Sequence, residues 1–195
     1  MKINPIIITT GNINSIFFEI FFKSLKKKIE SPIILISNKD LLIKNLKKFN
    51  YQIKFKIISE QDVLNGYYVK NTINLIDIDL KTSIIKSKNL IERLYIKKSF
   101  ELAFKLIRKK VSNKFLNGPI NKKNFLNKKY LGITEYLAKN FNQKDTGMLI
   151  YNKELSVCPL TTHLPIKLVS KKITKTLIIN RLKMINNFFK KNFKL

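Results

Sequence analysis

The stretch IIITTGNINSIFFEIFFKSLKKKIESPIILIS, from Ile6 to Ser37, contains a complete strand–helix–strand pattern. It opens with a β-type run, Ile6 to Thr10, continues through a helical pattern, Ser15 to Lys28, and closes with a second β-type run, Ile33 to Ser37. Short β-type runs that alternate with longer helical patterns are typical of strand–helix–strand units and a largely parallel sheet. The stretch therefore predicts an α/β protein.

The same alternation continues along the chain. The further β-type runs are Ile53 to Ile58, Asn74 to Ile78, Lys114 to Asn117, Met148 to Tyr151 and Leu155 to Leu160. The further helical patterns are Lys39 to Phe49, Asn89 to Lys110, Thr134 to Asn140 and Lys175 to Phe193. We expect a three-layer αβα arrangement around a mostly parallel sheet.

Two of the helical patterns carry apolar residues at spacings of three and four, which places those residues on one helix face. In the first pattern they are Ile96, Phe100, Ala103 and Ile107, and in the last they are Ile178, Leu182, Ile185 and Phe189. Thr174 is placed to be the N-cap of the last helix. We interpret both stripes as packing faces rather than as part of a cofactor site.

Composition limits the class of protein. A chain of 195 residues with 45% hydrophobic residues can bury a sizeable core as one domain. No internal repeat and no linker rich in proline, glycine or serine divides it, so we expect one domain over residues 1–195, with a possible sub-division near residue 115. The single cysteine, Cys158, excludes an internal disulfide, which fits a reducing cytoplasm.

The sequence predicts a soluble cytoplasmic protein. The apolar run near the N-terminus is too short for a secretory signal. Glu19 and Lys23 interrupt the most apolar segment, so no stretch reaches the roughly 18 apolar residues of a membrane helix.

A formal net charge of +27 raises the question of a nucleic-acid partner. Arginine provides most bidentate phosphate and guanine contacts, yet the arginines among the 39 basic residues are only Arg93, Arg108 and Arg181. The lysines are scattered over most segments. We interpret the charge as a solvated surface rather than a nucleic-acid site.

Two segments place turn-forming and polar residues near the ends of predicted strands, where open α/β sheets bind ligands. In NGPINK, Asn117 to Lys122, a Gly-Pro turn precedes Lys122, which would begin a helix and bind a phosphate or carboxylate. In GITEYLA, Gly132 to Ala138, Thr134 would either cap the helix or offer its hydroxyl to a ligand. When each segment is taken alone, an ordinary loop and a plain N-cap are the favoured explanations.

A third segment, TTHLPI, Thr161 to Ile166, contains the only histidine of the chain, His163. The polar turn, closed by Pro165, is suited to a metal ligand or an acid–base group. One histidine is not a metal site, because a catalytic metal usually takes about three protein ligands.

Taken in order, these segments resemble the 4-hydroxythreonine-4-phosphate dehydrogenase family. That family carries a Gly-Pro or Ala-Pro turn followed by lysine, then Gly-His-Thr-Glu before an aromatic-rich helix, then Thr-Thr-His-Leu-Pro. The opening IIITTGNINSIFFEI resembles the family's first strand and loop, and INLIDI, Ile73 to Ile78, falls in its expected place. The resemblance extends over essentially the whole chain.

The resemblance implies a fold like that of isocitrate and isopropylmalate dehydrogenases, and a homodimer with shared active sites. It also implies that NAD or NADP takes a hydride from 4-phosphooxy-threonine, and that the resulting β-keto acid loses carbon dioxide to leave 3-amino-2-oxopropyl phosphate in vitamin B6 (pyridoxal phosphate) biosynthesis. A divalent metal (zinc, magnesium or cobalt) suits both steps. By resemblance, His163 is a metal ligand, Thr134 a substrate contact and Lys122 a candidate for binding the substrate's anionic group; no catalytic residue is assigned.

The chain departs from the family in three ways. Ile133 stands where the family has histidine, and losing one preorganised donor typically costs about 2.7 to 4 kcal/mol of transition-state stabilisation. Asn12, Ser15 and Phe17 replace an aspartate and two glycines of the opening loop. Family members also continue past the position of Leu195, and that C-terminal part supplies two further metal-binding histidines and much of the site.

Three hypotheses therefore stay open. The chain is an active dehydrogenase whose remaining part comes from a separate chain, an inactive or fragmentary homologue, or a basic protein that binds anions or nucleic acid. The dehydrogenase hypothesis requires the turns at Gly118, Thr134 and His163 to line one cleft.

Overall fold

The computed structural model describes residues 3–80, 87–126, 129–130, 132–143 and 145–193. The chain packs as two compact units, residues 1–127 and 128–195. Whether a domain boundary lies near residue 115 or elsewhere stays a prediction, because compact packing does not by itself establish independent domains.

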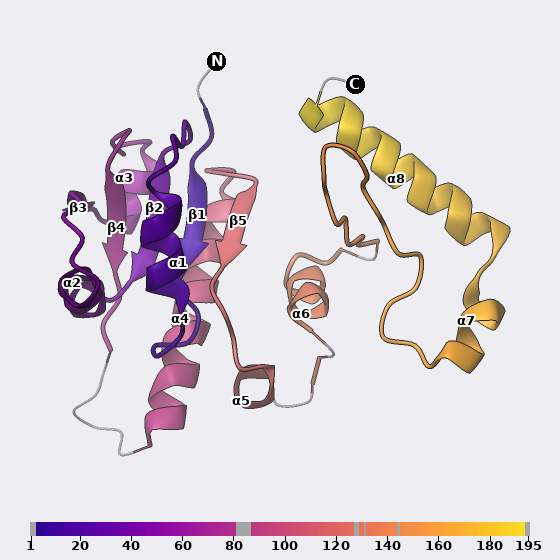
Figure 1. Ribbon diagram of the computed structural model, residues 1–195, viewed down its shortest axis with the longest axis horizontal. Coiled ribbons are helices and arrows are strands. Elements are labelled where there is room, and N and C mark those ends of the chain that lie inside the picture. Colours follow the sequence, from indigo (N-terminus) through magenta and orange to yellow (C-terminus); the bar gives the residue numbers. More distant parts are fainter. Residues whose placement is uncertain (1–2, 81–86, 127–128, 131, 144, 194–195) are drawn as a thin grey trace. The chain divides into compact units, whose positions relative to one another are not determined.

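Unit 1 contains a five-stranded sheet in the order β3-β4-β2-β1-β5, and all neighbouring strands are parallel (Figure 1). The strands are β1 (Ile6–Thr9), β2 (Ile33–Ser37), β3 (Phe55–Ile57), β4 (Ile73–Asp77) and β5 (Lys114–Asn117). The first five predicted β-type runs are therefore confirmed as strands, although β3 is shorter than the predicted run from Ile53 to Ile58.

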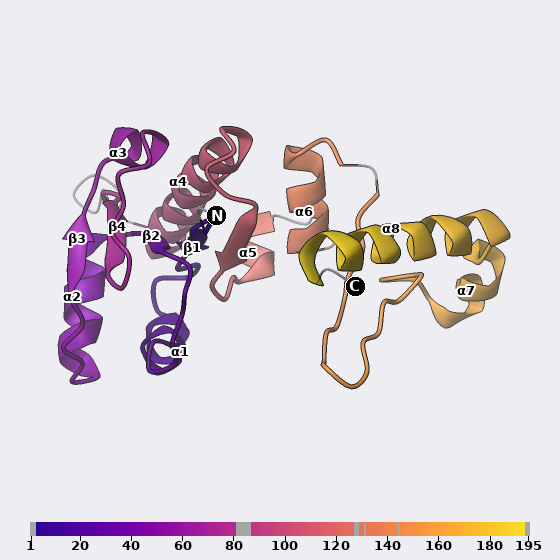
Figure 2. The ribbon, with the colours of Figure 1, turned by 90° about the horizontal axis from the view of Figure 1, so that it is seen from above.

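Five helices belong to this unit: α1 (Phe17–Ser24), α2 (Lys39–Lys48), α3 (Glu60–Leu64), α4 (Lys88–Arg108) and α5 (Lys122–Leu126). Figure 2 shows α1 and α2 on one face of the sheet and α3 and α4 on the other, so the three-layer prediction is confirmed. An ion pair between Lys105 Nζ and Glu60 Oε1, 2.6 Å long, joins α4 to α3 on their shared face.

Aromatic and aliphatic side chains fill both interfaces between helices and sheet. On one face, Phe18 and Phe22 of α1 are buried with Leu35 of β2. On the other, the predicted α4 stripe is confirmed, because Phe100 is 0% exposed and its ring centroid lies 5.5 Å from that of Phe115 in β5. Every residue of β2 is buried, as expected for a central strand covered on both faces.

Local side-chain caps start two helices of this unit. The Asn38 side chain accepts a hydrogen bond from Leu41 N (3.0 Å) at the start of α2. A capping box between Ser59 and Asp62 starts α3. This helix was not predicted, although the Ser-x-x-Asp spacing in the sequence indicates such a cap. The predicted first helix, Ser15 to Lys28, is longer than the observed α1.

Unit 2 contains α6 (Ile133–Asn140), α7 (Ile166–Lys172) and α8 (Lys175–Phe193). The two strands predicted here, Met148 to Tyr151 and Leu155 to Leu160, are wrong: only an isolated antiparallel bridge joins Ile150 to Val157. Ile150 is 61% exposed and Val157 50% exposed. Paired strands need a covered apolar face to be stable, and these residues lack one.

The last helix confirms its predicted N-cap and part of its predicted stripe. Leu177 N donates to Thr174 Oγ1 (3.1 Å), so Thr174 is the N-cap as expected. The α8 stripe is packed only toward its second half: Ile185 and Phe189 are half-buried, and the Phe189 ring centroid lies 6.4 Å from that of Tyr151, whereas Leu182 is 60% exposed and Ile178 37% exposed. Among the described residues, no helix is long and apolar enough to span a membrane.

Candidate active site at the carboxyl edge of the sheet

The loops that follow β1 and β5 lie against each other at the carboxyl edge of the sheet. These strands are neighbours and parallel, so both end at the same edge. Gly118 N donates to Thr9 O (2.7 Å), and Asn12 N donates to Pro119 O (2.8 Å). The Gly-Pro turn is thus hydrogen-bonded to the loop after β1, at the position where open α/β sheets bind ligands.

This close approach of the two backbones requires glycine on both sides. A Cβ atom at Gly118 would lie 2.0 Å from Thr10 O, and one at Gly11 would lie 2.3 Å from Pro119 O. Gly11 also has a φ of 73°, in the left-handed region. The predicted turn at Gly118 is therefore confirmed as part of a paired structure rather than an isolated loop.

A buried tyrosine hydroxyl joins three elements at the same edge. The Tyr95 hydroxyl of α4 lies 2.9 Å from Thr10 Oγ1 and 3.2 Å from Ser37 Oγ, and accepts a hydrogen bond from Asn38 N (3.2 Å). Burial raises the pKa of Tyr95, so the hydroxyl stays neutral. The ends of β1 and β2 are thereby held to α4.

Sequence reasoning missed this role of Tyr95. The predicted α4 stripe begins at Ile96 and leaves out Tyr95 and Ser99. These two residues are four positions apart, lie on the same helix face and are both buried. A polar residue at helical spacing beside an apolar stripe was the available signal.

Two carboxylates fix the neighbouring loops. Ile13 N donates to Glu92 Oε1 (2.8 Å), which ties the loop after β1 to α4. Lys39 N donates to Asp77 Oδ1 (2.8 Å), which ties the start of α2 to the end of β4. Both carboxylates accept backbone hydrogen bonds, so they hold the loops at the carboxyl edge of the sheet in place.

Lys122 is the first residue of α5, as predicted, and its side chain is exposed. The preceding residue positions it: Asn124 N donates to Asn121 Oδ1 (3.2 Å), while Asn121 N donates to Asn12 Oδ1. The backbone at the start of α5, which carries Lys122, is therefore held beside the loop after β1. Its binding of a substrate anion stays a prediction.

Thr134 lies within the first turn of α6 and its side chain is exposed. The N-cap position belongs to Gly132, so the expectation that Thr134 caps the helix is wrong. Because the chain becomes helical already at Ile133, Thr134 lies two positions past the N-cap and cannot cap the helix. The alternative role of Thr134, a hydroxyl offered to a ligand, stays a prediction.

His163 is exposed, in the turn before α7, with a φ of 59°. Positive φ is uncommon for a residue with a side chain, so His163 lies in a tight, specifically shaped turn. Among the residues that the structure describes, no group of three or more His, Cys, Asp or Glu side chains is arranged to hold a metal ion. The described residues alone therefore do not fit a complete divalent-metal site.

The candidate residues divide between the two units. Gly118 and Lys122 belong to unit 1, and Thr134 and His163 belong to unit 2. The structure brings the Gly118 turn, the loop after β1 and the start of α5 together. That Thr134 and His163 face the same cleft stays a prediction.

A protein-family model described as "Pyridoxal phosphate biosynthetic protein PdxA" matches residues 28–195, most of the chain. The chain belongs to the PdxA family. The resemblance read from the Gly-Pro turn, GITEY and TTHLP is thereby confirmed.

Relatives in the PdxA family are named 4-hydroxythreonine-4-phosphate dehydrogenase. The protein from Sulfurihydrogenibium sp. (strain YO3AOP1) is 33% identical over 193 residues, covering 95% of this chain and 58% of that protein. The Aquifex aeolicus (strain VF5) protein is 41% identical over 83 residues, covering 40% of this chain and 25% of that protein. The chain spans about half the length of the curated relatives that it matches along most of its sequence.

A solved structure supports the fold. The crystal structure of 4-hydroxythreonine-4-phosphate dehydrogenase from Klebsiella pneumoniae matches with a TM-score of 0.78 at 21% identity, covering 96% of this chain and 58% of that one. The predicted α/β fold of this dehydrogenase class is confirmed.

The substituted residues of the opening loop, Asn12, Ser15 and Phe17, all make contacts within unit 1. Asn12 and Ser15 both accept backbone hydrogen bonds, Asn12 from Asn121 N and Ser15 from Phe17 N (3.3 Å). Phe17 is 5% exposed, and its ring stacks on that of Phe21 at 5.3 Å. The substituted loop is therefore well packed, with a phenyl ring where the family has glycine.

Proposed function

We propose that this chain forms part of a 4-hydroxythreonine-4-phosphate dehydrogenase of vitamin B6 biosynthesis. The proposal rests on the 33% identity to a protein of that name over 95% of the chain, together with the family match. In the proposed reaction the C3–H hydride of 4-phosphooxy-threonine passes to NAD or NADP and the hydroxyl proton leaves. The β-keto acid then loses carbon dioxide to give 3-amino-2-oxopropyl phosphate. A cytoplasmic location accords with the single cysteine.

Each candidate residue has one part in this proposal. The exposed Lys122 ammonium attracts the substrate's phosphate, and its place beside the loop after β1 supports that assignment. The exposed Thr134 hydroxyl donates a hydrogen bond to the substrate. His163 provides a single ligand toward a divalent metal, and a complete metal site requires ligands from elsewhere.

We further propose that activity requires additional polypeptide, either a second copy in a homodimer or a separate chain that supplies the remaining part of the fold. Unit 2 supports this proposal, because Ile166 is 91% exposed, Leu155 72% and Leu182 60%. Exposed apolar surface marks a protein interface when it is contiguous, and these side chains are available to a covering partner. The relatives are long enough to contain such a covering segment, since the chain spans 58% of one of them.

The decisive experiment is an assay of purified chain with 4-phosphooxy-threonine, NAD or NADP, and zinc, magnesium or cobalt, following absorbance of the reduced cofactor. It is run with and without the C-terminal portion of the Sulfurihydrogenibium relative as a separate polypeptide. Activity that appears only with the added portion supports the proposal of a second chain. No reduced cofactor under any condition refutes the dehydrogenase proposal and leaves an inactive homologue.

Lys122→Gln tests the assignment of the anion site, with Lys123→Gln as a matched control in the same helix. The first change is expected to raise KM about tenfold or more, because a hydrogen bond to a charged group contributes about 1.5–3 kcal/mol. The second changes the net charge equally and is expected to leave KM unaltered. Equal effects of the two variants would refute a specific role for Lys122.

The charge of +27 favours one alternative, a basic protein that binds nucleic acid. That alternative predicts RNA or DNA affinity that falls steeply with salt, in proportion to the number of phosphates contacted. Weak binding of RNA or DNA with no sequence preference would show that the affinity comes from overall positive charge and not from a specific nucleic-acid site.

A further inference from the structure

A hollow of about 510 Å³ lies at the amino edge of the sheet in unit 1, the edge opposite the candidate active site. Ile33 and Ile73, the first residues of β2 and β4, are paired in register and line it. The rest of the lining comes from the segment after α1 and from the residues before β3 and β4. Its volume is in the range of small-molecule sites, about 300–1,000 Å³.

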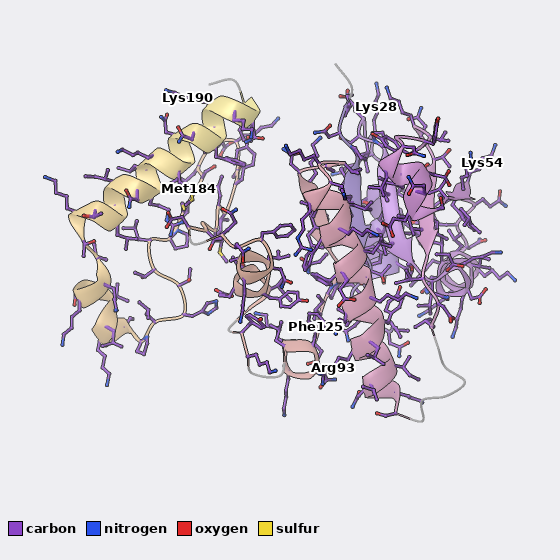
Figure 3. All side chains as sticks on the ribbon, turned by 180° about the vertical axis from the view of Figure 1, so that it is seen from behind. Lys28, Lys54, Arg93, Phe125, Met184 and Lys190 are labelled. Carbon is purple, nitrogen blue, oxygen red and sulfur yellow. The ribbon has the colours of Figure 1, made fainter. Side chains whose placement is uncertain are left out.

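The lining combines an apolar floor with cations. Ile33 is 7% exposed and Ile73 2% exposed. Lys27, Lys28 and Lys54 also line the hollow, and no aspartate or glutamate does. Figure 3 shows Lys28 and Lys54 toward the same end of unit 1. An apolar surface beside several cations is complementary to an organic anion.

These lysines are not neutralised by ion pairs within the described part of the chain. The ion pairs found there involve Lys23, Lys97 and Lys105. Lys27 and Lys28 follow the carboxyl end of α1, the end of a helix that favours cations. Lys54 precedes β3 instead, so the helix dipole does not explain why it lines the same hollow.

A buried asparagine preforms one wall of the hollow. Asn74 is 0% exposed, and its Nδ2 donates to Ile33 O (3.0 Å) and Val69 O (2.8 Å), while its Oδ1 accepts from Val69 N (2.8 Å). These bonds fix the turn that carries Asn71 and Thr72 into the lining. The polar groups of that wall are therefore held in place before any ligand arrives, which lowers the cost of binding.

A further lysine contacts the lining from β5. Lys114 Nζ donates to Ser31 Oγ (3.0 Å), and Ser31 lines the hollow. This contact brings a fourth ammonium group close to the lining. The electrostatic character of the hollow is thus consistently positive.

We propose that this hollow binds a small organic anion, with its phosphate or carboxylate held by Lys27, Lys28 and Lys54 and its apolar body resting on Ile33 and Ile73. The site lies at the opposite edge of the sheet from the proposed dehydrogenase site, and it does not depend on that proposal.

The test is NMR titration of the full chain, observing backbone amides, with phenyl phosphate, benzoate and benzyl alcohol as separate probes. Phenyl phosphate or benzoate is expected to shift amides at Ser31, Lys54, Asn71 and Thr72 saturably, with a Kd of about 1 mM or tighter. Which of the two binds more tightly identifies the preferred anion. Uncharged benzyl alcohol is expected to shift these amides much less, because it lacks the group that the lysines attract.

A matched pair of double variants distinguishes specific binding in the hollow from nonspecific attraction of anions to the positively charged surface. Lys28→Gln/Lys54→Gln is expected to weaken binding about tenfold or more, since each hydrogen bond to a charged group is lost. Lys44→Gln/Lys47→Gln changes two exposed lysines of α2 outside the lining and is expected to leave the Kd unchanged. Equal weakening in both variants, shifts spread over the whole surface, or no saturable shift would each overturn the proposal.

Discussion

Replacing Tyr95 by phenylalanine removes one buried hydroxyl and leaves the ring. The hydroxyl is within hydrogen-bond distance of Thr10 Oγ1 (2.9 Å), Ser37 Oγ (3.2 Å) and Asn38 N (3.2 Å). Ser37 Oγ retains a contact with Asn38 O at 3.4 Å, whereas the other two groups lose the partner that the tyrosine provides. Leaving a buried polar group unsatisfied costs about 1–3 kcal/mol, so we expect Tyr95→Phe to lower the free energy of unfolding by about 3 kcal/mol.

Urea unfolding followed by circular dichroism measures this loss, and amide hydrogen exchange locates it at the carboxyl ends of β1 and β2. For a chain of this length, about 3 kcal/mol corresponds to a fall in Tm of roughly 6–12 °C. Tyr67→Phe is the matched control, because Tyr67 is 69% exposed and losing its hydroxyl should change stability by less than about 0.5 kcal/mol. If Tyr95→Phe also changed stability by less than about 0.5 kcal/mol, the hydroxyl would not join these elements as argued.

Four further changes test other contacts. Asn74→Leu should destabilise the fold by about 3 kcal/mol in urea unfolding, because backbone groups at both ends of the 69–74 turn lose buried partners; an unchanged midpoint would contradict this. Gly118→Ala should cost about 1–3 kcal/mol, since its Cβ would lie 2.0 Å from Thr10 O; wild-type stability would show that the two loops separate freely. Thr9→Val should instead stabilise by about 1 kcal/mol, because Thr9 Oγ1 is buried with no hydrogen-bond partner among the described residues; a loss of stability would show that the hydroxyl is bonded. Finally, burial raises the pKa of Tyr95 above the ordinary 10.0, so the folded state holds this proton more tightly than the unfolded state. The stabilisation from that proton is complete below pH 10.0 and is lost as the pH rises through the folded-state pKa, and Tyr95→Phe should flatten this alkaline decline in a pH series of thermal melts.

The sheet could be predicted because its inner strands, β1, β2 and β4, are covered on both faces. Such strands form continuous apolar runs, as in Ile33 to Ser37, and the sequence alone identifies them. The same reasoning failed in unit 2, where Met148 to Tyr151 is equally apolar but largely exposed. Hydrophobicity indicates a preference for burial, and it does not show whether a covering surface is present.

The candidate site could be predicted only in its local parts. The Gly118 turn and the start of the helix at Lys122 depend on neighbouring residues, and both are confirmed. The Tyr95 contacts were missed because their partners lie 85, 58 and 57 positions away in the chain. Thr134 was misread as a candidate cap because helix ends shift by one or two residues without altering the apolar pattern.

Phe17 makes the altered opening loop difficult to reverse. Its ring is almost wholly buried and stacks on Phe21, so restoring the family's glycine would remove a large core side chain at a cost of about 3–5 kcal/mol. Such a loss is a large part of a typical domain's stability. A glycine at this position would therefore need compensating changes in the side chains that surround the Phe17 ring, Phe21 among them.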